Sequence, residues 1–125
     1  MRLLLDTQIY LWFVSEPEHL PRNATDVMAS ADTIYISTAS LWEIAIKVRI
    51  GKLKADPAEL VAQLISSGFD PLPIQPEHVL PVARLPLYHS DPFDRMLVAQ
   101  AMHEGMKLLT TDRKLPQYSD LVIRV

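Results

Sequence analysis

The sequence predicts a three-layer α/β/α protein in which a central, mainly parallel sheet is covered by helices on both faces. Short apolar runs typical of strands alternate along the chain with longer segments of helical periodicity, and this alternation is typical of parallel sheets. Most of the ten prolines fall at the boundaries between these segments. There is no internal repeat, linker or low-complexity tract, so residues 1–125 are expected to form a single domain.

Five segments have the features of strands. The first is a short apolar run that ends in an acid, and the second is rich in β-branched residues, which favour strands. The third contains Pro71 and Pro73, and because proline cannot donate to the hydrogen-bond ladder, we place it at a sheet edge. The expected strands are residues 2–6, 33–37, 69–74, 107–110 and 121–125.

Six segments are expected to be helical. Proline at the first position and glycine beyond the last mark the segment that begins at Pro57 and stops before Gly68. Asp91 and Pro92 also predict a helix start, since an aspartate cap accepts a backbone N–H and proline fits the first turn. Pro81 should kink or divide the fifth helix. The expected helices are residues 7–15, 23–31, 40–50, 57–67, 76–85 and 92–101.

Four acids are expected to meet at one edge of the sheet. Asp6 ends the first strand, Asp112 follows the fourth, and Glu43 lies in the first turns after the second. Asp94 projects into the otherwise apolar face of a helix that opens at the same edge, where a charge needs a cation or several donors to compensate it. Because open α/β sheets place their sites beyond the carboxyl ends of the strands, this edge is the expected functional site.

Taken singly, most of these acids have an ordinary structural explanation. Asp6 and Asp91 can cap helices, and Asp112 suits a turn. Glu43 could close a capping box with Ser40. The case for a site therefore depends on the four acids converging, which the spacing alone does not establish.

Other polar residues lie near the same edge. Ser37, Ser40 and Thr110 could each hold a carboxylate or a water, although such residues more often cap turns. His89 could support a ligand or contact substrate, but a loop role is the more common one for such a residue. The remaining histidines are expected at the surface or at element boundaries, and they are His19, His78 and His103.

The composition limits the kinds of site that are possible. With no cysteine, thiolate chemistry and zinc–thiolate or iron–sulfur centres are excluded, so any metal would be held by oxygen or histidine. The apolar residues, 49% of the total, never form an uninterrupted run of about 18, which argues against a membrane span. The apolar run Leu3–Leu5 is too short for a signal peptide. We therefore expect a cytoplasmic protein.

The net charge of −3 gives no overall attraction to nucleic acid, so such a partner would need a local basic surface. The densest group of basic residues lies at the end of the third helix, where cations suit the helix dipole. Glu43 and Lys47 also have the spacing of a helical ion pair. If the acidic edge is a nuclease site, the possible RNA contacts are Lys47, Arg49, Lys52, Lys54 and Arg95.

Four short motifs resemble those of a known family in their order and over essentially the whole chain. They are Leu4–Thr7, Ser40–Glu43, Asp91–Arg95 with the helix that follows, and Leu109–Asp112. Together they are similar to the PIN-domain ribonucleases of the VapC toxin family. Gln8 and Ser90 depart from the pattern, at positions where relatives often carry histidine and a basic residue. These departures concern substrate preference and not chemistry.

The resemblance implies a PIN-like fold and an endoribonuclease that hydrolyses RNA phosphodiester bonds with Mg²⁺ or Mn²⁺. It further implies the toxin of a toxin–antitoxin pair, with a cognate antitoxin protein as partner and a homodimeric assembly. Thr110 would support the site and Asp91 would lie beside it. The acids that would hold the metal and act in catalysis are Asp6, Glu43, Asp94 and Asp112.

Two other functions are weighed against this one. A non-catalytic RNA- or protein-binding domain could keep the same fold, although the intact set of acids argues against it. A phosphoacceptor receiver module has a similar length and an acidic Mg²⁺ site, but it needs an acidic pair at the first strand and an acceptor aspartate after a middle strand. Here the first strand ends in Asp6 alone and the second in Ser37.

Overall fold

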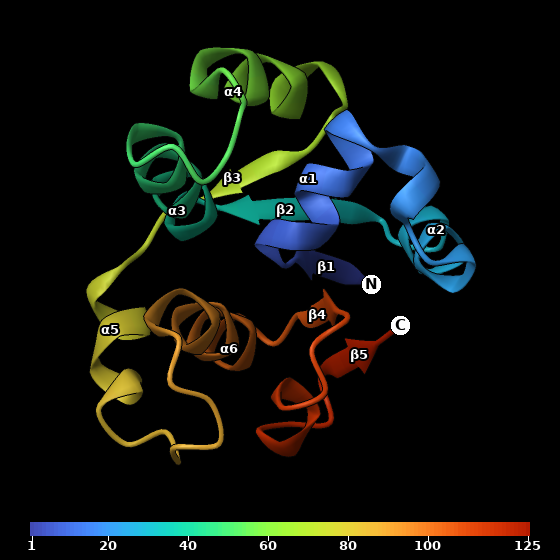
Figure 1. Cartoon of the computed structure of the whole chain (residues 1–125). Helices are drawn as coiled ribbons and strands as arrows, with labels where there is room; N and C mark the ends of the chain where they lie inside the picture. The colour runs from blue at the N-terminus through green and yellow to red at the C-terminus, as the bar shows by residue number, and fades with distance from the viewer.

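The computed structural model describes residues 1–125 and contains one five-stranded sheet (Figure 1). The strand order is β3-β2-β1-β4-β5, and every neighbouring pair is parallel. β1 is therefore the central strand. Strands β2 and β3 follow on one side of it and β4 and β5 on the other, so the direction of strand addition reverses between β1 and β4. The strands are β1 (Arg2–Leu5), β2 (Thr33–Ser37), β3 (Asp70–Leu72), β4 (Lys107–Thr110) and β5 (Val122–Arg124). The predicted parallel sheet and the edge position of β3 are confirmed.

Six α-helices connect these strands, and all six were predicted from the sequence. Two short 3₁₀ turns, Pro17–His19 and Leu115–Gln117, add to them. The helices are α1 (Thr7–Ser15), α2 (Arg22–Ala29), α3 (Thr38–Arg49), α4 (Pro57–Ser66), α5 (Pro76–Val82) and α6 (Pro92–Glu104). Pro81 lies in the last turn of α5, which ends one residue later, so this proline ends the helix instead of kinking it.

Helices cover both faces of the sheet, as Figure 1 shows with α1 to α4 on one side and α5 and α6 on the other. Successive side chains of β1 point to opposite faces. Leu3 and Leu5 are buried in the core beneath α1, α2, α3 and α4, whereas Leu4 is buried in the core with α6. The central strand is thus apolar on both faces, as expected for a parallel sheet between two helical layers.

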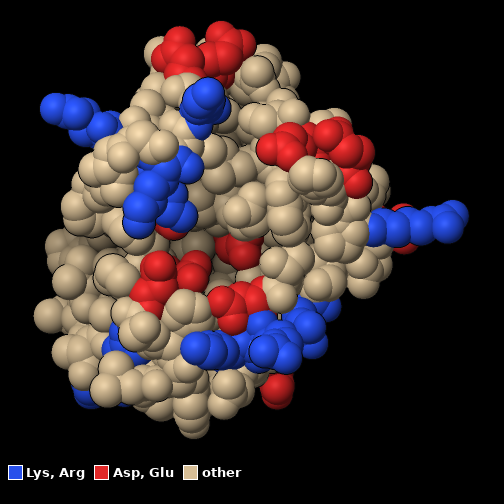
Figure 2. Space-filling model, viewed as in Figure 1, with Lys and Arg blue, Asp and Glu red and all other residues tan.

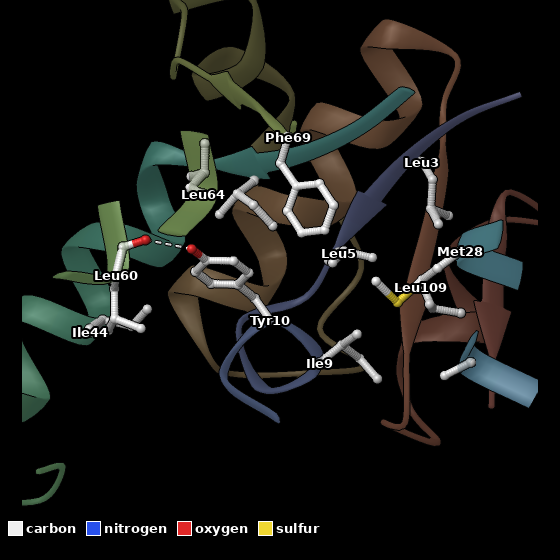
Figure 3. Close-up of a cluster of buried hydrophobic side chains, with 12 residues drawn as sticks. Leu3, Leu5, Ile9, Tyr10, Met28, Ile44, Leu60, Leu64, Phe69 and Leu109 are labelled. Atoms are coloured by element: carbon white, nitrogen blue, oxygen red, sulfur yellow. Dashed lines mark hydrogen bonds between the residues drawn. The ribbon is translucent and has the colours of Figure 1, made fainter. Parts of the chain in front are cut away.

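The larger core surrounds the side chain of Tyr10 on α1 (Figure 3). Its ring lies beside Phe69, with ring centroids 6.3 Å apart, and its hydroxyl donates to the carbonyl of Leu60, 2.5 Å away. This hydrogen bond satisfies the one polar atom of a fully buried ring. It also ties α4 to α1, the helix that begins at the acidic edge. None of the helices combines the length and apolar character needed to span a bilayer.

Candidate functional site at the carboxyl edge of the sheet

The four predicted acids lie in one cavity at the carboxyl edge of the sheet, where the strand order reverses between β1 and β4. The cavity has a volume of about 270 Å³. Figure 2 shows acidic side chains gathered in a hollow of the surface, with basic side chains on two sides. The residues that line it are Asp6, Thr7, Gln8, Leu11, Glu43, Lys47, Asp91, Asp94, Thr111 and Asp112.

Asp6 is held at the floor of this cavity by local structure. It follows β1 directly and caps α1, where its Oδ1 accepts the N–H of Ile9 at 2.8 Å, and Thr110 donates to its Oδ2. Only 6% of the residue is exposed. Burial raises the pKa of Asp6 to about 6, opposed by the hydrogen bonds from Thr110 and Ile9 and reinforced by the nearby charges of Asp112 and Glu43.

Asp94 occupies the first turn of α6 beside the cap residue Asp91. One carboxylate oxygen of Asp91 accepts the N–H groups of Phe93 and Asp94, at 2.8 and 3.0 Å. Burial raises the pKa of Asp94 to about 7, and the charges of Asp91 and Asp6 add to this shift. A carboxylate with its pKa this close to neutral is a common feature of functional sites. Both Asp91 and Asp94 line the cavity, as predicted.

Glu43 reaches the cavity from the second turn of α3 and is 7% exposed. Its Oε2 accepts from the ammonium of Lys47 at 2.7 Å, which confirms the predicted ion pair. Its other carboxylate oxygen, Oε1, is buried without a hydrogen-bond partner. A buried carboxylate oxygen without a donor is costly, so this atom indicates that a cation belongs in the cavity.

The proposed capping box between Ser40 and Glu43 is wrong. Helix α3 begins at Thr38, because the Ser37 hydroxyl caps it by accepting the N–H of Ala39 at 3.0 Å. Ser40 is instead buried inside the helix, where it accepts a hydrogen bond from Thr7 at 2.9 Å. Glu43 therefore lies in the second turn of the helix and not in its first. Ser37 itself caps the helix and does not line the cavity.

Asp112 approaches from beyond β4 and is fixed through both carboxylate oxygens. Oδ1 accepts the N–H of Lys114 at 2.7 Å, and Oδ2 lies 2.8 Å from Nε2 of His89. Partial burial acts to raise the pKa of Asp112, but the Lys114 and His89 hydrogen bonds outweigh it, so the pKa lies below its ordinary value. Thr110 accepts the N–H of Asp112 at 3.0 Å while donating to Asp6, and so supports two acids at once.

The sequence-based interpretation did not assign His89 to the site. Its Nε2 lies 2.8 Å from Asp112 and 3.4 Å from Asp94, and one ligand atom from each of these three residues lies within 4.8 Å of the others. The signal that could have identified it is the position of His89 two residues before the Asp91 cap. This spacing brings the imidazole within reach of the Asp91 backbone N–H, 3.0 Å away.

The prediction of an RNA contact at Arg95 is wrong. This side chain is buried, with 9% of the residue exposed. Its guanidinium donates to the backbone carbonyls of Val82, Leu85 and Pro86 at 2.8 to 3.2 Å. The loop between α5 and α6 contains few backbone hydrogen bonds of its own, so its carbonyls need donors, and Arg95 supplies them. Arg95 therefore holds this loop and does not face a ligand.

The other four basic residues predicted to contact RNA are at least partly exposed to solvent. Lys47 lines the acidic cavity, whereas Arg49, Lys52 and Lys54 are exposed at and beyond the end of α3. Lys54 lines a neighbouring hollow that shares Gln8 and Leu11 with the acidic cavity. The two hollows are therefore adjacent, and Lys54 lines the one that does not contain the acids.

The donor set of the cavity fits a hard divalent cation. The four predicted ligands Asp6, Glu43, Asp94 and Asp112 all line the cavity, together with the cap residue Asp91. Oxygen ligands select Mg²⁺ or Mn²⁺ over softer metals. Burial is the main reason that the pKa values of Asp6 and Asp94 are raised, and the charges of the neighbouring carboxylates add to it. A bound cation would offset both effects and would give the buried Oε1 of Glu43 a partner.

The fold and the cavity together define a class: a parallel α/β protein with a cluster of carboxylates at the point where the strand order reverses. The chain belongs to the PIN-domain family, because the family model described as PIN domain matches residues 3–121. The chain is also similar to ribonuclease VapC22 of Mycobacterium tuberculosis. The two are 28% identical over 115 residues, which cover 90% of this chain and 88% of the relative.

Solved structures of the same fold come from complexes. The chain aligns with one in the crystal structure of VapBC2 from Rickettsia felis bound to a promoter DNA fragment, at a TM-score of 0.71 and 17% identity, covering 100% of this chain and 98% of the other. It also aligns with one in a toxin–antitoxin complex from Klebsiella pneumoniae, at a TM-score of 0.66 and 18% identity, covering 97% and 95%. At these identities the likeness establishes the fold, and it agrees with the predicted PIN-like architecture.

Proposed function

We propose that this protein is a metal-dependent endoribonuclease that hydrolyses RNA phosphodiester bonds. The observation that carries the proposal is the cavity into which Asp6, Glu43, Asp94 and Asp112 converge, with one buried oxygen of Glu43 left without a donor. Membership of the PIN-domain family and similarity to a protein named as a ribonuclease support the assignment. The expected cofactor is Mg²⁺ or Mn²⁺, held by these four carboxylates.

The residues of the cavity would have different roles in hydrolysis. A divalent ion bound here would offset the charge that builds on the scissile phosphate and make a water more acidic. A carboxylate of the cavity, such as Asp94, would take the proton of the attacking water as the new P–O bond forms. The P–O bond to the leaving ribose oxygen then breaks, and that oxygen takes up the proton that the carboxylate received from the water. Glu43 would orient the same water, and Lys47, which also lines the cavity, would contact the phosphate.

We also infer that the protein acts in the cytoplasm as the toxin of a toxin–antitoxin pair. The support is the similarity to a VapC ribonuclease and the shared fold with chains of VapBC complexes. A cognate antitoxin would have to cover the acidic cavity to suppress cleavage. Its covering segment would need a cation, since that is what the crowded carboxylates lack. Co-expression with the product of a neighbouring short reading frame, followed by co-purification, would test this part of the proposal.

A homodimer is the expected assembly, and exposed apolar side chains give a surface for it. Trp42 on α3 is 60% exposed and lies edge-on to Phe93 of α6, with ring centroids 5.2 Å apart. Ile46, one helical turn further along α3, is also exposed. Contiguous apolar surface of this kind commonly marks an interface between chains. Sedimentation of wild-type protein and of Trp42→Glu would test whether this face joins two copies.

The central test of the proposed activity is Asp94→Asn. The amide is isosteric but can neither accept the proton nor supply the charge, so cleavage of a fluorescent RNA in Mn²⁺ should fall by at least ~10³-fold. Circular dichroism should show an unchanged fold. The matched control is Asp26→Asn on the exposed face of α2, which should cleave like the wild type. Cleavage by Asp94→Asn at the wild-type rate would refute the proposal.

The alternative is a non-catalytic RNA- or protein-binding domain with the same fold. It predicts that the wild-type protein binds RNA but leaves it intact with Mg²⁺, Mn²⁺ and every other divalent ion tested. Isothermal titration with Mn²⁺ in the absence of RNA also distinguishes the nuclease from the binding domain. The nuclease should bind Mn²⁺, whereas a binding domain does not need a carboxylate site that binds metal. Cleavage that is abolished by EDTA and restored by Mn²⁺ would exclude the alternative.

A further inference from the structure

His89 contacts two of the four acids but does not line the cavity they form. Its Nε2 lies 2.8 Å from Oδ2 of Asp112 and 3.4 Å from Oδ2 of Asp94. The imidazole therefore contacts both carboxylates although it does not itself line the cavity. Its side chain is 15% exposed, so the contact is shielded from most of the solvent. This ring could either bind the metal directly or orient the carboxylates that bind it.

The hydrogen bond at the other ring nitrogen answers that question. The backbone N–H of Asp91 donates to Nδ1 of His89 at 3.0 Å. A backbone N–H can only donate, so Nδ1 must carry a lone pair, and the proton of the neutral ring must be on Nε2. Nε2 then donates to Asp112. A metal ligand would need a free lone pair on Nε2, which this arrangement does not leave.

The loop that carries His89 is fixed by contacts to its backbone. The His89 N–H donates to the hydroxyl oxygen of Tyr118 at 3.0 Å, and the His89 carbonyl accepts from Arg95 at 3.4 Å. The same two side chains also bind the carbonyl of Pro86, at 2.7 and 2.8 Å. The imidazole therefore has little freedom to move away from Asp112.

We propose that His89 is a positioning residue that orients Asp112, and secondarily Asp94, toward the metal. With Oδ2 held by His89 and Oδ1 by the N–H of Lys114, the Asp112 carboxylate has one defined orientation. The Nε2 proton also lies between two carboxylates that would otherwise repel each other. Hydrogen bonds to metal-binding carboxylates commonly set metal affinity in this way. The inference rests on the proposed function in assigning a metal to the cavity.

Two substitutions separate positioning from ligation. His89→Ala removes the donor, and Mn²⁺ affinity measured by isothermal titration should fall by ~10-fold or more, with the stoichiometry unchanged. His89→Gln places an amide N–H near the position of Nε2, so it should recover most of the lost affinity. If His89→Gln is as weak as His89→Ala, or if His89→Ala binds Mn²⁺ like the wild type, the positioning role is wrong.

The decisive readout needs neither RNA nor catalysis. Nitrogen-15 spectra of the histidine rings in metal-free protein should show His89 neutral with its proton on Nε2, and saturation with diamagnetic Mg²⁺ should leave that tautomer unchanged. Transfer of the Nε2 proton to Nδ1 on metal addition would make His89 a ligand and overturn the inference. If RNA cleavage fails while the tautomer and the Mn²⁺ affinity pattern hold, the proposed activity is wrong but the positioning role stands.

A double-mutant cycle tests whether His89 acts through Asp112. If it does, His89→Ala should have little further effect on Mn²⁺ affinity in an Asp112→Ala background. Independent, additive losses would contradict the inference, because they would mean that His89 contributes without Asp112. Thermal unfolding of each variant establishes that the affinity is measured on folded protein.

Discussion

Helix α6 carries a histidine–carboxylate cluster at each end. The Asp94 cluster at its beginning contains His89, Asp94 and Asp112, and the Glu104 cluster at its end contains His78, His103 and Glu104. The two lie at opposite edges of the sheet, since the carbonyl of Glu104 accepts from the side chain of Arg2 at the start of β1. In both clusters one histidine accepts a backbone N–H through Nδ1 and turns Nε2 toward a carboxylate.

The two clusters differ in what surrounds the carboxylates. At the Glu104 end a single acid faces His78, which is 1% exposed, and no cavity is lined by the residues of this cluster. Nδ1 of His78 closes the first turn of α5 by accepting the N–H of Gln75 at 2.9 Å. At the Asp94 end, several acids line one cavity that is open to solvent. A histidine beside a carboxylate is therefore a structural clamp in one place and part of a candidate site in the other.

The largest expected difference between the two ends is in catalysis. Glu43→Gln, which alters an acid of the cavity, should lower the rate of RNA cleavage by at least ~10³-fold, because it removes charge from the metal site. Glu104→Gln should leave the rate unchanged, since Glu104 lies at the opposite edge of the sheet. Both rates are measured with a fluorescent RNA under saturating Mn²⁺. An equal loss in both variants would show that the Glu104 cluster also serves the reaction.

The second expected difference is in stability, and here the larger effect is expected at the Glu104 end of α6. His78→Ala should lower the free energy of unfolding by about 3 kcal/mol, because it empties a buried position and leaves the N–H of Gln75 without its acceptor. His89→Ala removes a partly exposed ring with two hydrogen bonds and should cost about 1 kcal/mol. Urea denaturation of metal-free protein measures both. A His89→Ala variant less stable than His78→Ala would mean that the His89 loop holds the fold together.

The sequence predicted the strands and three of the acids for local reasons. Asp6 and Asp112 follow apolar runs at the ends of β1 and β4, and Asp94 follows the Asp91-Pro92 start signal. Glu43 was also placed at the correct edge, but its capping box was not correct. Ser37, Thr38 and Ser40 are all acceptable cap residues. In the structure Ser37 caps the helix, whereas Ser40 accepts a hydrogen bond from Thr7, which is 33 residues away in sequence.

The roles of three other side chains depend on contacts between distant parts of the chain. His89 meets Asp112 across 23 residues, and His78 meets Glu104 across 26. His78 was expected at the surface or at an element boundary; it lies in the first turn of α5, but it is buried. Arg95 carries the charge of a surface residue but is buried by the carbonyls of the preceding loop. No periodicity encodes such pairings, because they join side chains and carbonyls from different elements.

The smallest expected difference is in how the free energy of unfolding of the metal-free protein depends on pH. The folded-state pKa of Asp94 is raised to about 7, whereas an unfolded aspartate titrates near ~3.9, so the folded protein binds this proton more tightly. The contribution of Asp94 to the stability of metal-free protein therefore falls as pH rises from about 4 to 7. Asp94→Asn lacks this penalty, and in EDTA at pH 8 it should be more stable than the wild type by about 2 kcal/mol, allowing for partial solvent screening.

Measuring this pH dependence would sharpen the contrast between the ends of α6. Urea denaturation in EDTA at pH 5 and pH 8 should give a stabilisation by Asp94→Asn that is much larger at the higher pH. Excess Mn²⁺ should reverse the order at pH 8, because only the wild type gains stability from a complete set of metal-binding carboxylates. Glu104→Gln should not stabilise the protein at either pH, since its carboxylate serves as the acceptor for buried His78. A stabilised Glu104→Gln would mean that both ends hold crowded carboxylates, and the distinction between clamp and site would not hold.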